Sequence, residues 1–309
     1  MKNIYHIDKK ITKNDEITDR TWISIEEPTA EDKKFLLEDL KIPAAFYNDI
    51  EDIDERPRIE VEDDWTFVLL RIPHKTTNEK SPFITVPLGI VYNKNYFVTI
   101  TFYKADLLLD FVNYYSTRKT IEETDNLNLI LRFHLSASVW FLKYLKQINI
   151  QIKNAENDLE RSIKNEDLQT LFNIEKSLVY FNTSLRSNEI LLYRFKSQRK
   201  IKNILEEELL EDVEIELKQA IDTSHIFSDI LSGMMDAYAS VISNNLNVIM
   251  KRLTSISIIL MIPTLIASIY GMNVTNHLEK NPTGIYLILF GSIILSVLGV
   301  WLFLKKKWI

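Results

Sequence analysis

Two long runs without a charged residue constrain this chain more than any other feature. The first, Leu253 to Asn276, holds an apolar core of 18 residues ending at Tyr270, and the second, Ile285 to Leu304, holds 20 residues. A helix of 18 residues covers roughly 27 Å, close to the hydrocarbon thickness of a bilayer. Buried helices of soluble proteins, the alternative interpretation, usually have apolar runs of about 10 to 14 residues. We therefore expect two membrane spans, at about 253–272 and 285–304.

The charges around these spans predict their orientation. Two spans joined by a short loop form a hairpin, so both flanks of the pair lie on one side of the bilayer. Lys251 and Arg252 precede the first span and Lys305 to Lys307 follow the second, whereas the loop carries only Lys280, beside Glu279. Because cationic flanks stay in the cytoplasm, we expect a multi-pass protein of the cell membrane with both termini cytoplasmic.

The composition excludes several classes of protein. The chain has 309 residues, a net charge of −6 and no cysteine. The acidic balance argues against nucleic acid as a partner, and the lack of cysteine excludes disulfides and thiolate metal sites. With six glycines there is no phosphate-cradling loop, and no nucleophilic grouping stands out, so we expect neither an enzyme nor an organic cofactor. The polar stretch Met1 to Lys13 shows no cleavable signal peptide.

Ahead of the spans, the expected secondary structure changes near residue 126 from β-rich to helical. Up to residue 125, β-rich runs alternate with turns and with one helical stretch, Glu31 to Leu40, behind a capping sequence, Pro28-Thr29. We expect an N-terminal α/β cytoplasmic domain at 1–125. Its strands are expected at Thr21 to Ile25, Arg58 to Val61, Thr66 to Ile72, Leu88 to Tyr92 and Tyr96 to Thr101.

Long helices are expected after that domain. Apolar residues recur every three or four positions, which predicts a packed helical pair at about 127–163 and 167–200. A last helix is expected to begin near Asn203 and to run unbroken into the first span. From Asp212 to Asn273 such a helix covers roughly 90 Å, a length that only a stalk requires. The expected division is thus 126–250 for the pair and stalk, and 251–309 for the membrane domain.

Possible metal ligands in the N-terminal domain have a simpler explanation. Carboxylates crowd Asp49 to Asp64, and oxygen ligands of this kind bind hard cations. A run of charges is more often a solvated surface, which is our interpretation here. The five histidines have no paired helical spacing, so they give no zinc signature.

One face of the last helix carries polar residues through the membrane. Steps of three and four residues from Asp222 through Asp229 give a stripe that changes from carboxylate to amide to hydroxyl. Its members along the pore are Asp236, Asn247, Met250, Thr254, Ser257, Met261, Thr264 and Ser268. A repeat of 3.5 residues holds the stripe on one face. The alternative is that these small polar residues mediate helix packing, as serine and threonine often do in membranes.

A pore lining gives this stripe a physical meaning. Two spans cannot enclose a water-filled path, so a channel requires a cyclic oligomer of four, five or six chains. Asp236, repeated around the ring, concentrates cations at the cytoplasmic mouth. Asn247, Thr254 and Thr264 offer neutral oxygens, while Met250 and Met261 form apolar constrictions.

The end of the first span resembles a known family. The tripeptide Gly271-Met272-Asn273, placed between two terminal spans, is similar to the signature of the CorA-type divalent-cation channels. The resemblance extends through Ser232 to Tyr238, through Asn247 to Lys251 and to the Lys-Lys-Lys-Trp terminus. It implies an α+β chain that assembles into a CorA-like homopentameric funnel. It also implies that Gly271, Met272 and Asn273 form the selectivity entrance.

The amide and the glycine of that entrance suit the chemistry. Mg²⁺ keeps several of its waters, so a ring of Asn273 carboxamides is expected to hydrogen-bond the hydrated ion without stripping it. Gly271 is expected to allow close approach and a turn. The loop departs from the family, since many relatives carry an acidic segment where this chain has only Glu279, beside Lys280. His277 could favour a softer metal such as Co²⁺, Ni²⁺ or Zn²⁺, but our interpretation is an ordinary exposed loop histidine.

The resemblance also implies regulation by the transported ion. In the family, Mg²⁺ bound between neighbouring cytoplasmic domains holds the pore shut. Asp212 lies where the family places one such carboxylate, with Glu211 beside it. An ordinary acidic helix start is the alternative.

We therefore predict a divalent-cation channel, with passive Mg²⁺ influx driven by the membrane potential and gated by internal Mg²⁺. Its expected partners are copies of itself, the lipid bilayer and divalent metal ions, with Mg²⁺ both carried and regulatory. A Co²⁺/Ni²⁺ or Zn²⁺ transporter on the same scaffold is the first alternative. A membrane-anchored cytoplasmic sensor or enzyme is the second, but it leaves the polar stripe unexplained.

Overall fold

The structure is a computed structural model that describes residues 1–14, 16–17, 21–78, 81–117, 121, 125–161, 165–197, 206–272 and 283–306. It divides into two compact units, Met1–Ser232 and Gly233–Ile309. The helical pair, which the sequence analysis assigned to a segment of its own, lies in the first unit together with the sheet. Its helices pack directly on the strands.

A seven-stranded mixed sheet forms the centre of the first unit. The order of the strands is β2-β1-β3-β7-β6-β5-β4, and β3 pairs with β7 in parallel, whereas the other neighbouring strands pair antiparallel. The five predicted strands are confirmed, and β1 and β2 form an additional hairpin at the edge. The bounds are β1 Lys2–Ile7, β2 Ile11–Asn14, β3 Thr21–Glu26, β4 Arg58–Glu62, β5 Trp65–Lys75, β6 Phe83–Tyr92 and β7 Phe97–Thr101.

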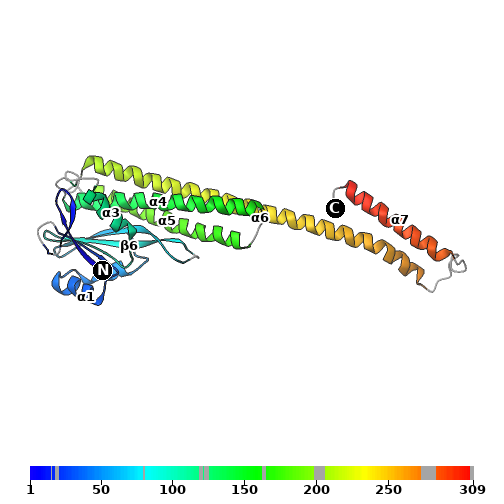
Figure 1. Ribbon diagram of the computed structural model, residues 1–309, viewed down its shortest axis with the longest axis horizontal. Helices are drawn as coiled ribbons and strands as arrows, with labels where there is room; N and C mark the ends of the chain where they lie inside the picture. Colours follow the sequence, from blue (N-terminus) through cyan, green and yellow to red (C-terminus); the bar gives the residue numbers. More distant parts are fainter. Residues whose placement is uncertain are drawn as a thin grey trace. The chain divides into compact units, whose positions relative to one another are not determined.

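Short helices cover one face of the sheet (Figure 1). They are α1 Ala30–Lys34, which continues into the π-helical turn η1 Phe35–Asp39, and α2 Ala44–Glu51. The expected cap is confirmed, since the backbone N–H of Asp32 donates to the Thr29 hydroxyl and the Asp32 carboxylate accepts from the Thr29 N–H. This reciprocal pair satisfies donors that a helix start otherwise leaves free. Phe46 of α2 stacks on Phe67 of β5 in the core.

Long helices cover the opposite face (Figure 1). They are α4 Asn126–Arg161 and α5 Asn165–Ser197, with α3 Asp106–Thr117 packed against α4. Because side chains alternate along a strand, the buried Val68 and Leu70 of β5 face this layer, while Phe67 and Leu69 face α2. Sheet burial on both faces explains why β5 is a nearly continuous apolar run.

The longest helix is α6, Glu207–Tyr270. Within the first unit it buries apolar positions three or four residues apart, namely Leu209, Val213, Leu217 and Ala220. Asn182 of α5 donates to the Ser228 hydroxyl at 2.9 Å, and Arg132 of α4 pairs with Glu206 at 2.8 Å. The helix begins at Glu207, whereas the sequence predicted a start near Asn203, a residue that lies outside the described residues.

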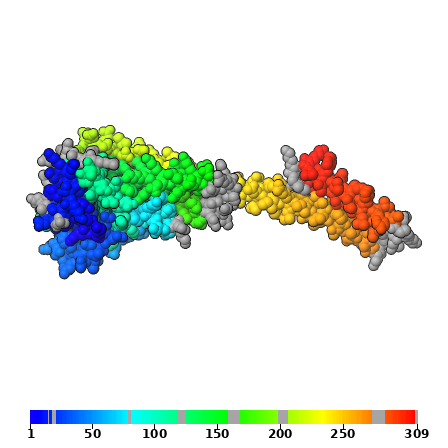
Figure 2. Space-filling view, viewed as in Figure 1, coloured from blue at the N-terminus to red at the C-terminus, as the bar shows by residue number. Residues whose placement is uncertain are grey.

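Two helices of the second unit are long and apolar enough to cross a membrane, the C-terminal part of α6 and α7 Gly284–Lys305. In each, only 6% of the apolar window is buried, unlike the core helix of a soluble protein. Figure 2 shows α7 alongside the C-terminal part of α6. The predicted α+β architecture with a long helix and two C-terminal apolar helices is confirmed.

Candidate functional site

The predicted entrance begins where α6 ends. The helix stops at Tyr270, and the N–H of Gly271 still donates to the Ala267 carbonyl at 2.9 Å. Gly271 has no positive φ, and a Cβ added there meets the Ala267 carbonyl oxygen at 3.4 Å, an ordinary contact. The turn within one chain therefore does not itself require glycine. Met272 is exposed, while Asn273, His277 and Glu279 lie outside the described residues.

The membrane part of α6 has one side that packs on α7. Ser255 is fully buried, and its hydroxyl donates to the Lys251 carbonyl at 2.8 Å. A Cβ added at Gly299 of α7 lies 3.5 Å from Ile262 and 3.9 Å from Ile259 of α6. Gly299 thus lets the two helices approach closely, as small residues do between membrane helices.

The predicted pore-lining residues lie on the other side of α6. At about 100° per residue, their mean direction in the span differs by roughly 160° from that of the residues packed on α7. Ser257 is half-buried, whereas the remaining predicted positions are exposed in the single chain. These are Asp236, Asn247, Met250, Thr254, Met261, Thr264 and Ser268. The structure therefore separates the polar stripe from the face that α7 covers.

Two hydroxyls of this stripe, those of Ser257 and Thr264, donate their protons within the helix. Ser257 donates to the Leu253 carbonyl at 2.9 Å, and Thr264 donates to the Leu260 carbonyl at 3.0 Å. Each hydroxyl has one donor and two acceptor positions, so the oxygen lone pairs remain free to accept. An exposed row of such oxygens can accept hydrogen bonds from the waters of a hydrated cation.

The predicted regulatory carboxylates lie on a solvent-exposed turn near the start of α6. Glu211 and Asp212 are both exposed, and nearby Glu214 pairs with Lys196 of α5 at 2.6 Å. Across the described residues, no group of three or more histidine or carboxylate side chains is arranged to hold a metal ion. The two carboxylates alone offer part of a coordination shell for Mg²⁺, which usually binds few protein ligands and several waters.

The acidic run Asp49 to Asp64 is organised around one cation. Arg58 of β4 pairs with Asp49 at 2.5 Å, with Glu60 at 3.0 Å and also with Glu55. Burial raises the pKa of Asp49 above its usual value, while the Arg58 charge opposes that rise. These carboxylates are therefore engaged in fixing the α2–β4 connection.

Sequence reasoning missed a buried polar network between the sheet and the helices. The Asn188 side chain of α5 accepts from the backbone N–H of Arg71 at 3.0 Å and donates to its carbonyl at 2.8 Å. The His134 ring of α4 contacts the Asn188 carbonyl at 3.1 Å. Burial lowers the pKa of His134 to about 4 and also lowers the pKa of Arg71. The available signal was Arg71 itself, the one charge in the strand sequence Trp65 to Pro73.

Comparisons with known proteins agree with this architecture. The model of the family described as CorA-like Mg²⁺ transporter protein matches residues 18–306. The chain is 26% identical over 292 residues to a cobalt/magnesium transport protein CorA of Methanocaldococcus jannaschii, covering 93% of this chain and 91% of the relative. A Thermotoga maritima protein of the same name is 26% identical over 273 residues, covering 84% of this chain and 75% of the relative.

A solved structure extends the likeness to the whole fold. The complete structure of the CorA magnesium transporter from Methanocaldococcus jannaschii superposes with a TM-score of 0.86 at 25% identity. The match covers 100% of this chain and 99% of the solved one, so both units have counterparts in it.

Proposed function

Because the chain belongs to the CorA-like Mg²⁺ transporter family, we propose that it forms a homopentameric channel for passive Mg²⁺ influx, driven by the membrane potential. Membership of the family makes it a membrane transporter of divalent cations. The proposal adds the pentamer, the passive mode, the preference for Mg²⁺ and the cytoplasmic position of both termini. No step involves covalent chemistry.

One observation carries the proposal, namely that the oxygen-bearing side of α6 lies opposite its contact with α7. Within the span the uncovered row consists of the hydroxyl groups of Thr254, Ser257, Thr264 and Ser268, and against lipid their oxygens lack water as a hydrogen-bond partner. Several α6 helices around one axis, with α7 outside, restore that partner by turning the row to a shared water-filled path.

Each part of the row has a separate role in this pathway. Asp236 raises the local cation concentration at the inner mouth, and Asn247, Thr254 and Thr264 accept hydrogen bonds from the hydrated ion. Met250 and Met261 narrow the path with apolar side chains that stop conduction when the pore dewets. At the outer end, Gly271, Met272 and Asn273 form the entrance, where the amide holds Mg²⁺ through its waters.

Internal Mg²⁺ closes the pore in this scheme. Asp212 and Glu211 supply carboxylates that face a neighbouring subunit, where Mg²⁺ between the two chains removes their mutual repulsion. When internal Mg²⁺ falls, that repulsion returns and the ring loosens. Glu279 adds a weak attraction for cations at the outer loop.

The test uses the absence of cysteine from the chain, so that each variant contains a single thiol. Ser268→Cys and Thr264→Cys place it on the exposed stripe, while the control Ser255→Cys places it on the buried side. In proteoliposomes, we expect a cationic thiol reagent to modify the stripe positions at least about tenfold faster than position 255, because reactivity follows exposure. That modification should block Mg²⁺ uptake.

Equal modification of all three positions, or full uptake after modification at 264 and 268, would refute the pore assignment. The same vesicles settle the choice of ion. Uptake of Co²⁺, Ni²⁺ or Zn²⁺ in preference to Mg²⁺ would leave the pore assignment intact but refute Mg²⁺ as the transported ion, in favour of a softer metal.

A further inference from the structure

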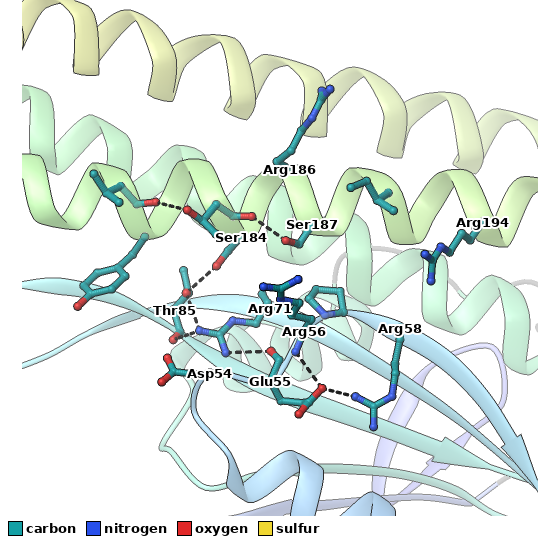
Figure 3. A pocket seen from close by; sticks show the side chains of 15 residues that line it. Asp54, Glu55, Arg56, Arg58, Arg71, Thr85, Ser184, Arg186, Ser187 and Arg194 are labelled. Carbon is teal, nitrogen blue, oxygen red and sulfur yellow. Dashed lines mark hydrogen bonds and ion pairs between the residues drawn. The ribbon is translucent and has the colours of Figure 1, made fainter.

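A basic groove lies between α5 and the sheet of the first unit and shares no residue with the proposed pathway (Figure 3). Its walls are α5, strands β4 to β6 and the α2–β4 connection, residues 54–57. Its volume is about 860 Å³, within the range of pockets that hold an organic ligand of moderate size. A single inorganic anion would occupy a small part of it.

Arginine dominates the charge of this groove. Five line it, and two of these are already neutralised, Arg58 by three carboxylates and Arg186 by Glu189 at 2.5 Å. The other three are Arg56, Arg71 and Arg194, and within the described part of the chain the guanidinium group of none of them makes an ion pair. The lining has two acidic side chains, and of these Glu55 pairs with Arg58 whereas Asp54 makes no ion pair within the described residues. The unpaired groups therefore leave a clear positive excess.

Arg71 is the strongest sign that an anion belongs here. It is only 8% exposed, and its guanidinium donates to the Thr85 carbonyl at 2.7 Å and to the Thr85 hydroxyl at 2.9 Å. The same guanidinium also donates to the carbonyls of Ile53 and Glu55, so these hydrogen-bond acceptors are all neutral. Asp54 and Asp52 act on this charge from a distance, but desolvation outweighs them and lowers the pKa of Arg71. A bound anion in direct contact offsets that desolvation cost.

The two exposed arginines approach from different elements. Arg56 belongs to the α2–β4 connection, and Figure 3 shows Arg194 projecting from α5 towards the strands, whereas Arg186 projects from the other side of the helix. Neither Arg56 nor Arg194 makes an ion pair within the described residues, so both planar guanidinium groups are free to bind a phosphate in bidentate fashion.

The rest of the lining indicates an apolar part in the ligand. Val179 is 56% exposed, Ile190 is 49% exposed and Tyr180 is 37% exposed, and all three belong to α5 at the groove. Apolar side chains beside a cationic floor suit a molecule with a ring at one end and phosphate at the other.

We propose that this groove binds an organic phosphate of nucleotide size, with its phosphates held by Arg56 and Arg194 beside the buried charge of Arg71 and its ring against Tyr180 and Ile190. The site is separate from the ion pathway and does not depend on the transported ion. It gives the soluble part of the protein a small-molecule ligand of its own.

The experiment uses the full chain in detergent, in a buffer without phosphate, sulfate or divalent cations, so that no metal complex forms. Calorimetric titrations use ATP, pyrophosphate and inorganic phosphate as probes. We expect ATP to bind the unmodified chain, and the double variant Arg56→Gln/Arg194→Gln to bind it at least about tenfold more weakly, because two charge-assisted contacts are lost. Added salt should weaken binding by screening the exposed arginines.

The control is Lys146→Gln, which removes an exposed cation of α4 outside the groove and should leave the affinity unchanged. Absence of ATP binding, or equal binding by the double variant and the unmodified chain, would overturn the proposal. Equal affinities for inorganic phosphate and ATP would overturn the assignment to an organic phosphate, since the apolar wall would then contribute nothing.

Discussion

The buried His134 makes the stability of the first unit depend on pH. Its ring is fully buried, the Nε2–H donates to the Asn188 carbonyl at 3.1 Å, and Nδ1 has no hydrogen-bond partner. Burial disfavours the charged imidazolium, which lowers the pKa of His134 to about 4 in the folded chain. In the unfolded chain the pKa returns to about 6.5.

Stability falls as the pH falls, because the unfolded chain takes up the proton at a higher pH than the folded chain does. As the pH falls below about 6.5, the unfolded chain binds a proton at His134 that the folded chain refuses until about pH 4. The free energy of unfolding therefore falls by about 1.36 kcal/mol per pH unit in this window, or about 3 kcal/mol in all. Between pH 6.5 and pH 5 the expected loss is about 2 kcal/mol.

The variant His134→Gln removes the titrating group while keeping a side-chain N–H that can reach the Asn188 carbonyl. We expect unfolding in denaturant, followed by tryptophan fluorescence, to show a smaller loss of stability for the variant than for the unmodified chain between pH 6.5 and pH 5. The difference between the two slopes isolates His134, because the carboxylates are common to both proteins. Equal slopes would refute the assignment of a neutral, buried imidazole.

Two further predictions concern packing and regulation. Gly89→Ala should destabilise the first unit by about 1–3 kcal/mol, because the new Cβ overlaps Cγ1 and Cδ1 of the buried Ile50. In thermal unfolding, Ile50→Ala should therefore cost less in the Gly89→Ala background than in the unmodified chain, and equal costs in the two backgrounds would contradict the clash. Asp212→Ala should leave internal Mg²⁺ less able to close the channel, so proteoliposome uptake should persist at higher internal Mg²⁺, and identical inhibition curves would remove the gating role.

The sequence predicted the elements whose pattern is local. The two spans follow from charge-free length, the helical pair from apolar spacing, and the start of α1 from the capping sequence Pro28-Thr29. Strand β1 was missed because its residues are mostly half-buried and polar ones alternate within it, so its identity depends on pairing with β2 and β3.

The polar stripe of α6 was found by periodicity alone, but its direction was not. Only the packing of α7 against Ile259 and Ile262, together with the burial of Ser255, distinguishes the covered side from the open one. The role of Asn273 at the entrance depends on the sequence motif, because this residue lies outside the described residues.

The sequence by itself determined the class of this protein, because a bilayer imposes a length and an apolar composition that can be counted along one chain. The tertiary structure alone decided which distant groups meet, as in the unpaired Arg71 beneath α5 and the neutral His134 beside Asn188. Charge pairing and desolvation depend on distances across the fold, which no local pattern of residues records.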